Sequence, residues 1–211
     1  GQLGQKVLLI DHADKVAEKI RISGGGRANF TNRDLDPRAP HKHFISDNPH
    51  FCRSALSRYT PQDFTALLTQ HGVPFHEKHK GQLFCDHSAN DLIQMLLAEC
   101  EKGKVSRWQP CSVSAITHDA NTQLYTLQTS QGAVTCPAVV IATGGLPVPK
   151  IGATDYGLQI AKQFGLRVVP TRPALVPLTF DAQEWAPFVA LSGAALAVEI
   201  STGLKKNKTV F

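Results

Sequence analysis

The sequence predicts an α/β protein built around a sheet with parallel strands. Short continuous apolar runs, which are typical of buried parallel strands, occur at 7–10 and 138–142, and a further strand is predicted at 166–169. Segments with the apolar spacing of a helix lie between these runs. Strands and helices that alternate along a chain are typical of α/β sheets.

The composition is that of a globular protein. Of 211 residues, 42% are hydrophobic and 18% are charged, which excludes the disordered and fibrous classes. No apolar run approaches the roughly 18 to 20 residues of a membrane helix, and residues 1–30 show no signal-peptide pattern. The five cysteines are an odd number without a CxxC pair, so we expect no disulfide framework, no metal site and a cytoplasmic protein.

The net charge of +5 is a mild basic excess. Residues 1–60 hold most of it, with 10 basic and 6 acidic side chains. This bias suits a phosphate-rich partner, either a nucleotide cofactor or a nucleic acid, and it is equally within the range of an ordinary solvated surface.

The first element is a strand at Val7–Ile10 that ends at Asp11. Gly4 is a plausible helix C-cap, so residues 1–3 are expected to be the tail of a helix. The other end, 205–211, stops as an apolar run begins. We therefore expect the sequence to be a piece of a longer protein.

Two helices follow, each beginning at a capping signal. Thr60–Asp63 combines a Thr cap, a proline at the first helical position and an acid three residues after the cap, and this helix should end near Gly72. Ser88–Asp91 repeats the signal, with helical spacing to about Glu101.

A small antiparallel insertion is predicted at about 112–136. Its three segments alternate like strands, with a turn at Gln131–Gly132. After it come a buried strand at 138–142, a helix at 156–164 closed by Gly165, and a strand at 166–169.

Asp11 at the end of a parallel strand is a candidate for binding ribose hydroxyls. Dinucleotide folds place a carboxylate there, about 20 residues after a glycine fingerprint, which would lie before residue 1. Taken alone the signal is weak, because many strands end in Asp at a turn.

The most unusual stretch is Ser23–Asn32, with the sequence SGGGRANFTN. Its glycines allow backbone N–H groups to approach a ligand closely. A planar arginine suits phosphate, and three short polar side chains add contacts. The alternative is a flexible surface turn. The candidate ligand residues are Ser23, Gly24, Gly25, Gly26, Arg27, Asn29, Thr31 and Asn32.

A second glycine turn follows the predicted strand 138–142. Ala142, Thr143, Gly144 and Gly145 would let main chain approach a planar ring or a pyrophosphate at the carboxyl end of a sheet. The alternative is a tight strand-to-helix turn that needs glycine for its geometry alone.

Together these stretches resemble the BaiN/RdsA (YhiN-type) family of FAD-dependent oxidoreductases. The match extends over the whole chain, and the GGGR-x-N-x-TN stretch is its most specific part. Further matching segments are 48–52, 81–86, 152–157 and 172–177. The resemblance implies an FAD/NAD(P)-binding Rossmann-like domain of the two-dinucleotide-binding type. It implies that residues 1–178 are this domain without its first strand and glycine loop, and that 179–211 begin a β-rich inserted domain.

The resemblance also implies a set of FAD contacts. Asp11 would bind the ribose, Val113 would offer its backbone to the adenine, and the glycine-rich stretch would follow the pyrophosphate and flavin. The remaining implied contacts are Lys19, Ala142, Thr143, Gly144 and Gly145 and, at the start of a helix near the ring, Thr154, Asp155 and Gly157. No catalytic acid or base is identified.

Two departures from the family pattern stand near these contacts. Ala28 occupies the position of the usual cysteine, so any role of that thiol is absent here. Ala17–Lys19 replaces the usual Gly-Arg-Lys, so an arginine contact is lost, and Glu18 cannot replace it near phosphate.

The implied activity is flavin-mediated hydride transfer with NAD(P)H as reductant. The leading hypothesis is reduction of uridine to dihydrouridine in ribosomal RNA. Two alternatives remain open at this point: a flavin-dependent reductase of a small unsaturated compound, and a non-catalytic nucleotide- or RNA-binding module.

Overall fold

The computed structural model describes residues 1–173, 179–194, 199–201 and 208–210. The chain forms two compact units, Gly1–Pro170 and Thr171–Phe211. The expected domain boundary after residue 178 lies outside the described residues, as does most of the segment 172–177.

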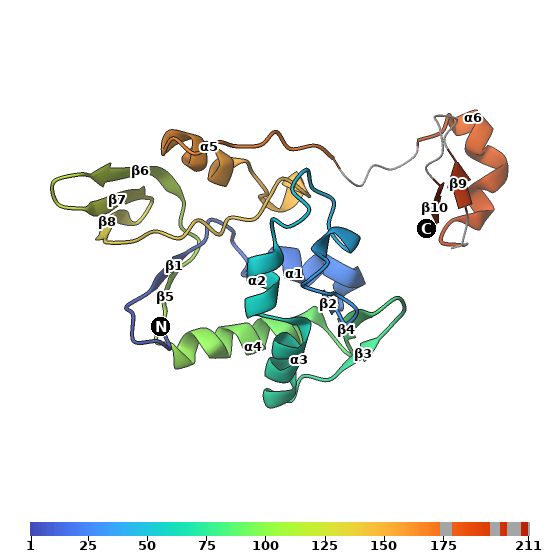
Figure 1. Ribbon diagram of the computed structural model, residues 1–211, viewed down its shortest axis with the longest axis horizontal. Helices are drawn as coiled ribbons and strands as arrows, with labels where there is room; N and C mark the ends of the chain where they lie inside the picture. The colour runs from blue at the N-terminus through green and yellow to red at the C-terminus, as the bar shows by residue number, and fades with distance from the viewer. Residues whose placement is uncertain (174–178, 195–198, 202–207, 211) are drawn as a thin grey trace. The chain divides into compact units, whose positions relative to one another are not determined.

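The first unit contains one parallel strand pair among its described residues. Strand β1 (Leu8–Ile10) pairs with β5 (Ser106–Trp108), and Leu8 is opposite Ser106 (Figure 1). The expected parallel strand is confirmed, but it is not buried, since Leu9 is 39% exposed. In the described part of the chain β1 has a strand neighbour on one side only, which leaves its other edge uncovered. Residues 1–3 form a turn with Gly4 at φ +83°, and the expected helix tail is not formed.

The glycine-rich stretch joins a short helix to an antiparallel sheet. Helix α1 (Glu18–Ile22) leads into the 3-10 turn η1 (Ser23–Gly26) and then into strand β2 (Asn29–Asn32). Strand β4 (Gln82–Cys85) lies at the centre of this sheet, between β2 and β3 (Phe75–Glu77).

The two capped helices form as predicted. In α3 (Pro61–Gln70) the Thr60 hydroxyl accepts from the Asp63 amide, and the Asp63 carboxylate accepts from the Thr60 amide. Helix α4 (Ala89–Lys102) has the same reciprocal cap between Ser88 and Asp91. The shorter helices between β2 and α3 are η2 (Pro40–Lys42) and α2 (Arg53–Arg58).

The antiparallel insertion is also confirmed. Strand β7 (Leu124–Thr129) pairs with β6 (Val113–Asp119) and β8 (Gly132–Cys136). After it come a short turn, η3 (Pro149–Ile151), and the predicted helix α5 (Tyr156–Gln163), which closes at Gly165 with φ +74°.

Two expected strands are wrong. Residues 138–142 and 166–169 form no regular element and pair with no described strand. Val140 is 87% exposed and Leu166 is 64% exposed. An apolar run becomes a buried strand only when neighbours on both sides accept its hydrogen bonds, and the described residues provide none for these two segments.

Two hydrophobic clusters hold the first unit together. The first lies between the β2–β4–β3 sheet and helices α3 and α4, and its buried members are Ala28, Leu68, Val73, Cys85, Ala89, Leu92 and Met95. The second lies between the insertion and α5, around Ile116, Leu127 and Ile160. The second cluster places α5 against the insertion, beside the end of β1.

The second unit contains a short helix, α6 (Ala182–Trp185), the turn η4 (Ala186–Leu191) and an antiparallel pair of β9 (Glu199–Ser201) with β10 (Lys208–Val210). The Phe180 and Trp185 rings stack with their centroids 4.8 Å apart.

Candidate functional site

Asp11 is fixed by its own turn at the end of β1. Its amide donates to the carbonyl of Trp108 (3.1 Å), and its carbonyl accepts from the amide of Cys111 (2.8 Å). One carboxylate oxygen, Oδ1, accepts from the Ala13 amide at 2.9 Å. No described residue donates to the other oxygen, which is therefore available to a ligand hydroxyl.

The glycine-rich stretch bends in a left-handed conformation. Gly24, Gly25 and Gly26 have φ of +58°, +65° and +86°, a region that residues with a Cβ enter only with strain. A Cβ on Gly24 would lie 2.7 Å from the amide nitrogen of Asn29 and 2.7 Å from the Phe84 ring. A Cβ on Gly25 or Gly26 would meet no atom within 4 Å. Gly24 is thus required by packing, whereas the next two glycines border open space.

Arg27 and Ala28 point their side chains to different environments. Arg27 is exposed, and its carbonyl accepts from the amide of Cys85 at 2.9 Å. Ala28 also has a left-handed φ of +51°, and its side chain is 1% exposed within the first hydrophobic cluster. The position where the resembling family has a cysteine therefore contributes to the core in this chain.

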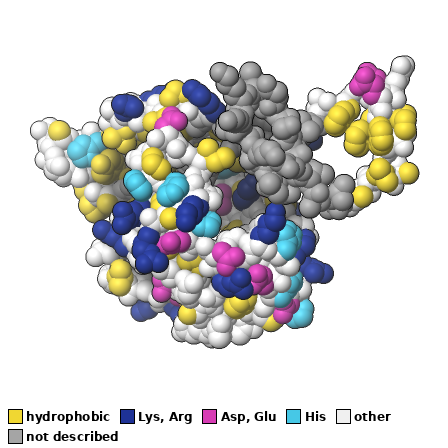
Figure 2. All heavy atoms as spheres, turned by 45° about the vertical axis from the view of Figure 1, so that its right-hand side comes forward, with side chains coloured by type: hydrophobic (Ala, Val, Ile, Leu, Met, Phe, Trp, Pro, Cys, Tyr) yellow, Lys and Arg dark blue, Asp and Glu magenta, His cyan; other side chains and the backbone are white. Residues whose placement is uncertain are grey.

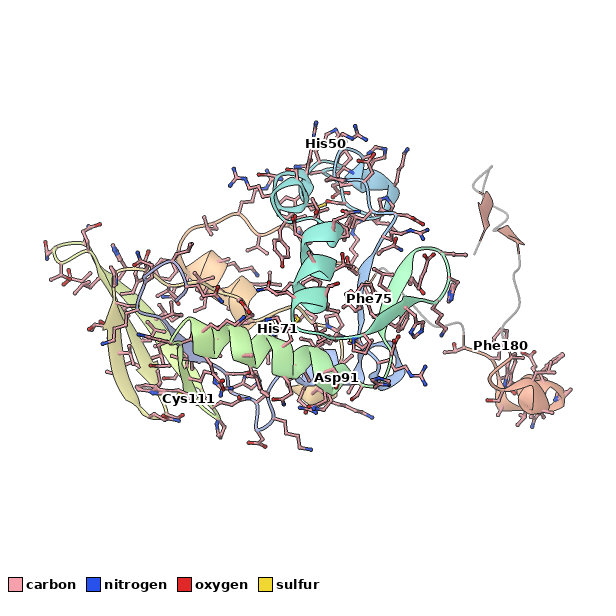
Figure 3. All side chains as sticks on the ribbon, turned by 90° about the horizontal axis from the view of Figure 1, so that it is seen from below. His50, His71, Phe75, Asp91, Cys111 and Phe180 are labelled. Atoms are coloured by element: carbon pink, nitrogen blue, oxygen red, sulfur yellow. The ribbon has the colours of Figure 1, made fainter. Side chains whose placement is uncertain are left out.

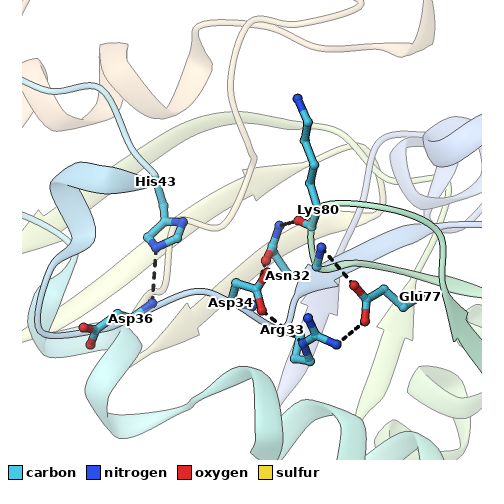
Figure 4. A network of polar contacts seen from close by, with 8 residues as sticks. Asn32, Arg33, Asp34, Asp36, His43, Glu77 and Lys80 are labelled. Atoms are coloured by element: carbon cyan, nitrogen blue, oxygen red, sulfur yellow. Dashed lines mark hydrogen bonds and ion pairs between the residues drawn. The ribbon is translucent and has the colours of Figure 1, made fainter. Parts of the chain in front are cut away.

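Asn32 uses its side chain to hold a neighbouring turn. Its Nδ2 donates to the carbonyl of Lys80 at 2.8 Å, and its Oδ1 accepts from the amide of Asp34 at 2.8 Å (Figure 4). Arg33 pairs with Glu77 in the same network. These contacts engage the Asn32 amide and identify a structural role for it that sequence reasoning missed.

The helix before the glycines is stabilised by local polar contacts. The Ser23 hydroxyl donates to the carbonyl of Ile20 at 2.9 Å, so it closes α1. Glu18 Oε1 and Arg21 Nε form an ion pair at 3.4 Å, although neither atom has a hydrogen-bond partner among the described residues. The Lys19 side chain is exposed.

The second glycine turn packs against the start of α5. A Cβ on Gly157 would lie 2.6 Å from Thr143 Oγ1 and 3.2 Å from Ile141 Cγ2, so only glycine fits there. Gly144 has φ +72° and open space beside it. His12 Nε2 lies 3.0 Å from the carbonyl oxygen of Gly152, which joins the Asp11 turn to the segment before α5.

Val113 and Tyr156 pack in the second cluster near this junction. The hydroxyl of Tyr156 is buried and has no hydrogen-bond partner among the described residues, and burial raises the pKa of this phenol. Sequence reasoning missed both Tyr156 and His12. Each is adjacent to a residue that was identified, but only the fold shows what it contacts.

The structure therefore brings the expected residues together in two groups. One group lies near the end of β1: Val113 packs in the second cluster with Ile10 and Tyr156, His12 contacts Gly152, and Gly157 packs on Thr143. The other expected residues of this group, Asp11, Ala142, Gly144, Gly145, Thr154 and Asp155, are neighbours of these along the chain. The second group is the glycine-rich stretch Ser23–Asn32 with Lys19. Open space borders Gly25 and Gly26 in the second group and Gly144 in the first.

Two open cavities lie in the first unit, and one of them is lined by Thr31 of the glycine-rich stretch. One, of about 200 Å³, lies between β2, α2 and α3 and is lined by Thr31, Tyr59, Phe64 and four further residues. The other, of about 350 Å³, lies between α3 and β3.

The described part of the chain contains no cluster of three or more His, Cys, Asp or Glu side chains arranged to hold a metal ion. None of its helices is long and apolar enough to cross a bilayer. All five cysteines are free thiols.

A parallel strand that ends in an acid and glycine turns that face open space are features of α/β proteins of the Rossmann type. The chain belongs to the family described as HI0933-like protein Rossmann domain, whose model matches residues 1–207.

Three relatives are similar to the chain over nearly its full length. It is 46% identical over 211 residues to the ribosomal RNA dihydrouridine synthase of Escherichia coli and covers 50% of that protein. It is 43% identical over 204 residues to the protein of the same name from Haemophilus influenzae, covering 49% of it. The 3-dehydro-bile acid delta(4,6)-reductase of Clostridium scindens is 22% identical over 204 residues, and the chain covers 47% of it. The chain thus spans about half the length of these relatives.

Proposed function

We propose that the protein is an FAD-dependent oxidoreductase that reduces uridine to dihydrouridine in ribosomal RNA. One observation carries this proposal: the 46% identity to the Escherichia coli ribosomal RNA dihydrouridine synthase extends over all 211 residues of the chain. At this level of identity over a whole chain, a shared substrate class is the simplest expectation.

The residues present fit FAD. The free carboxylate oxygen of Asp11 suits a ribose hydroxyl, and the open space beside Gly25 and Gly26 admits a pyrophosphate close to the backbone. Exposed Arg27 supplies a charge next to that space. Val113, Lys19 and the turn Ala142–Gly145 with the start of α5 complete the proposed set. Asn32 would act through its backbone, because its amide is already engaged.

Bound FAD would carry two electrons from NAD(P)H to the uracil ring. The balance is one hydride and one proton added across a carbon–carbon double bond, with NAD(P)⁺ released. The chain's own groups would orient the cofactor and set the local electrostatics.

The domain organisation is part of this proposal. Residues 1–178 would belong to an FAD domain of the two-dinucleotide-binding type, and 179–211 to a β-rich inserted domain. The β9–β10 pair in the second unit supports this division. The free thiols support a reducing cytoplasm as the site of action.

A second candidate is reduction of a small unsaturated compound. The 22% identity to the Clostridium scindens reductase favours it, but the identities to the two synthases are 46% and 43%. A third candidate, a non-catalytic nucleotide- or RNA-binding module, is favoured by the two departures at Ala28 and Glu18.

Two measurements separate the three candidates. The visible spectrum of the purified protein should show the absorption bands of flavin, and NADH or NADPH added without oxygen should bleach them. A purified protein without flavin would exclude both reductases, and the non-catalytic module would be the remaining candidate. Dihydrouridine mapped in ribosomal RNA should disappear in a deletion strain and return on complementation. Ribosomal RNA that keeps all its dihydrouridine after deletion would exclude the leading function and leave the small-molecule reductase.

A further inference from the structure

Residues 38–59 form an exposed segment that is rich in both cations and aromatic rings, and we name it the basic-aromatic segment. It contains four Lys or Arg and three His against one Asp. It runs from η2 through α2 to the residue before the α3 cap. Figure 3 shows His50 at the outer edge of this segment, among side chains that end in nitrogen.

Of the four Lys and Arg side chains of this segment, Arg38 pairs with Asp36, and the other three form no ion pair with a described residue. Lys42, Arg53 and Arg58 form no ion pair with any described carboxylate, although all three are exposed. By contrast, Arg21 pairs with Glu18, and Arg33 pairs with Asp34 and Glu77. Figure 2 shows Lys, Arg and His side chains spread over the visible face of the first unit (Figure 2). Unpaired cations concentrated in one segment attract a polyanion.

The aromatic rings of the segment are exposed to an unusual degree. Phe51 is 82% exposed, Tyr59 is 53% exposed and Phe44 is 44% exposed. Exposure of an aromatic ring to water is unfavourable in free energy. A ring that lies near a cation can stack on a nucleobase while the cation contacts the phosphate of the same nucleotide. Within the segment, the His41 and His50 rings lie edge to face with their centroids 6.3 Å apart.

The segment leads to the candidate site. The cavity of about 200 Å³ is lined by Leu56 and Tyr59 from the segment and by Thr31 from the glycine-rich stretch. Phe64 also lines this cavity, and its ring lies 6.3 Å from that of Tyr59. A chain bound along the segment would therefore place one of its bases beside the strand that follows the glycines.

We propose that the basic-aromatic segment binds a single-stranded stretch of the RNA substrate, with Lys42, Arg53 and Arg58 at phosphates and Phe51 and Tyr59 stacked on bases. This inference rests on the proposed function for the identity of the polymer. A basic, ring-bearing surface can also bind an anionic membrane, but the longest helix of the segment, α2, has six residues and presents no extended apolar face. Positively charged side chains that alternate with exposed aromatic rings favour binding of single-stranded RNA over binding of a membrane.

The test measures binding of a labelled oligouridine of about 12 nucleotides by fluorescence anisotropy over a range of salt concentrations. The triple variant Lys42→Ala/Arg53→Ala/Arg58→Ala should weaken binding and reduce the slope of log affinity against log salt by about 2, since each single-strand phosphate contact contributes roughly 0.7. Phe51→Ala should weaken binding about five- to a hundred-fold with an unchanged slope.

Matched controls separate this surface from general charge. The triple variant Lys6→Ala/Arg107→Ala/Lys162→Ala removes three exposed cations elsewhere and should leave affinity and slope unchanged. Phe51→Tyr keeps the ring and should bind as the original protein does. Equal thermal midpoints for all variants would show that folding is not the cause of any loss.

Two results would overturn the inference: equal RNA affinity in the segment and control variants, or segment-dependent binding of phosphatidylglycerol vesicles without binding of the oligouridine. The outcome is independent of the proposed activity. RNA bound through this segment by a protein that forms no dihydrouridine would contradict the function and keep the surface. Dihydrouridine formed by a protein whose segment variants bind RNA normally would contradict the surface and keep the function.

Discussion

The His71 imidazole, which is labelled beside α4 in Figure 3, lies 2.6 Å from the carboxylate of Glu99 and links the residue after α3 to the last turns of α4. Hydrogen bonds from Lys102, Gln2 and His71 lower the pKa of Glu99 to about 2 from an ordinary value of 4.5. Gln2 thereby connects the start of the chain to the same carboxylate. One acidic side chain therefore ties three segments together.

This carboxylate predicts a specific pH dependence of stability. Because its pKa is lower in the folded than in the unfolded chain, Glu99 stabilises the fold above pH about 4.5, and this contribution disappears as the pH falls toward about 2. Glu99→Gln should have a lower free energy of unfolding than the original protein at neutral pH. The difference in free energy of unfolding between the two proteins should become smaller as the pH falls from about 4.5 toward about 2. Urea midpoints measured at a series of pH values test this. Glu101→Gln, an exposed acid on the same helix, is the control and should show no such narrowing.

Arg27→Ala should weaken FAD binding. The guanidinium is the exposed charge next to the open space beside Gly25 and Gly26, and one charge-assisted contact contributes about 1.5 to 3 kcal/mol, or roughly ten- to a hundred-fold in affinity. Flavin titration measures the change, with Arg107→Ala as a matched exposed control. Equal flavin affinity in the two variants would remove Arg27 from the proposed site.

Neighbouring glycines should differ in what they tolerate. Gly24→Ala combines left-handed strain with a Cβ 2.7 Å from the Asn29 amide nitrogen and the Phe84 ring, and should cost roughly 2 to 5 kcal/mol of unfolding free energy. Gly25→Ala has only the backbone strain and should cost about 1 to 2 kcal/mol. Chemical denaturation compares them. Equal losses would mean that the loop packs differently against β4.

The contact between Gly157 and Thr143 can be tested by a double-mutant cycle. Gly157→Ala places a Cβ 2.6 Å from Thr143 Oγ1 and should destabilise the protein by about 1 to 3 kcal/mol. Thr143→Ala removes that oxygen from an exposed side chain and should cost less than about 0.5 kcal/mol alone. Combined, the two changes should cost less than Gly157→Ala by itself, because the clash is relieved. Strictly additive losses would contradict the packing of the second glycine turn on α5.

The sequence predicted correctly those elements that are specified by residues close together in the chain. The caps of α3 and α4 depend on Thr60 with Asp63 and Ser88 with Asp91, pairs three residues apart that meet whenever a helix begins. The antiparallel insertion could also be predicted, because its strands alternate apolar and polar residues and pair with their neighbours in sequence. The left-handed turn at Gly24–Gly26 is possible because these residues have no Cβ, which is a property of the local sequence alone.

The tertiary structure alone decided the elements and roles that depend on distant partners. The segments 138–142 and 166–169 have the composition of strands but form none in the described structure. Whether a strand forms depends on hydrogen bonds to neighbouring strands, and composition does not determine which neighbours are present. Asn32 stays a predicted ligand residue, and only the fold shows that its side-chain amide holds the Lys80 turn, 48 residues away. Ala28 lies in the same stretch, and only the fold shows that its side chain packs in the core. Local sequence determines which conformations a segment can adopt, whereas contacts between remote segments select the one that buries apolar surface and satisfies the backbone.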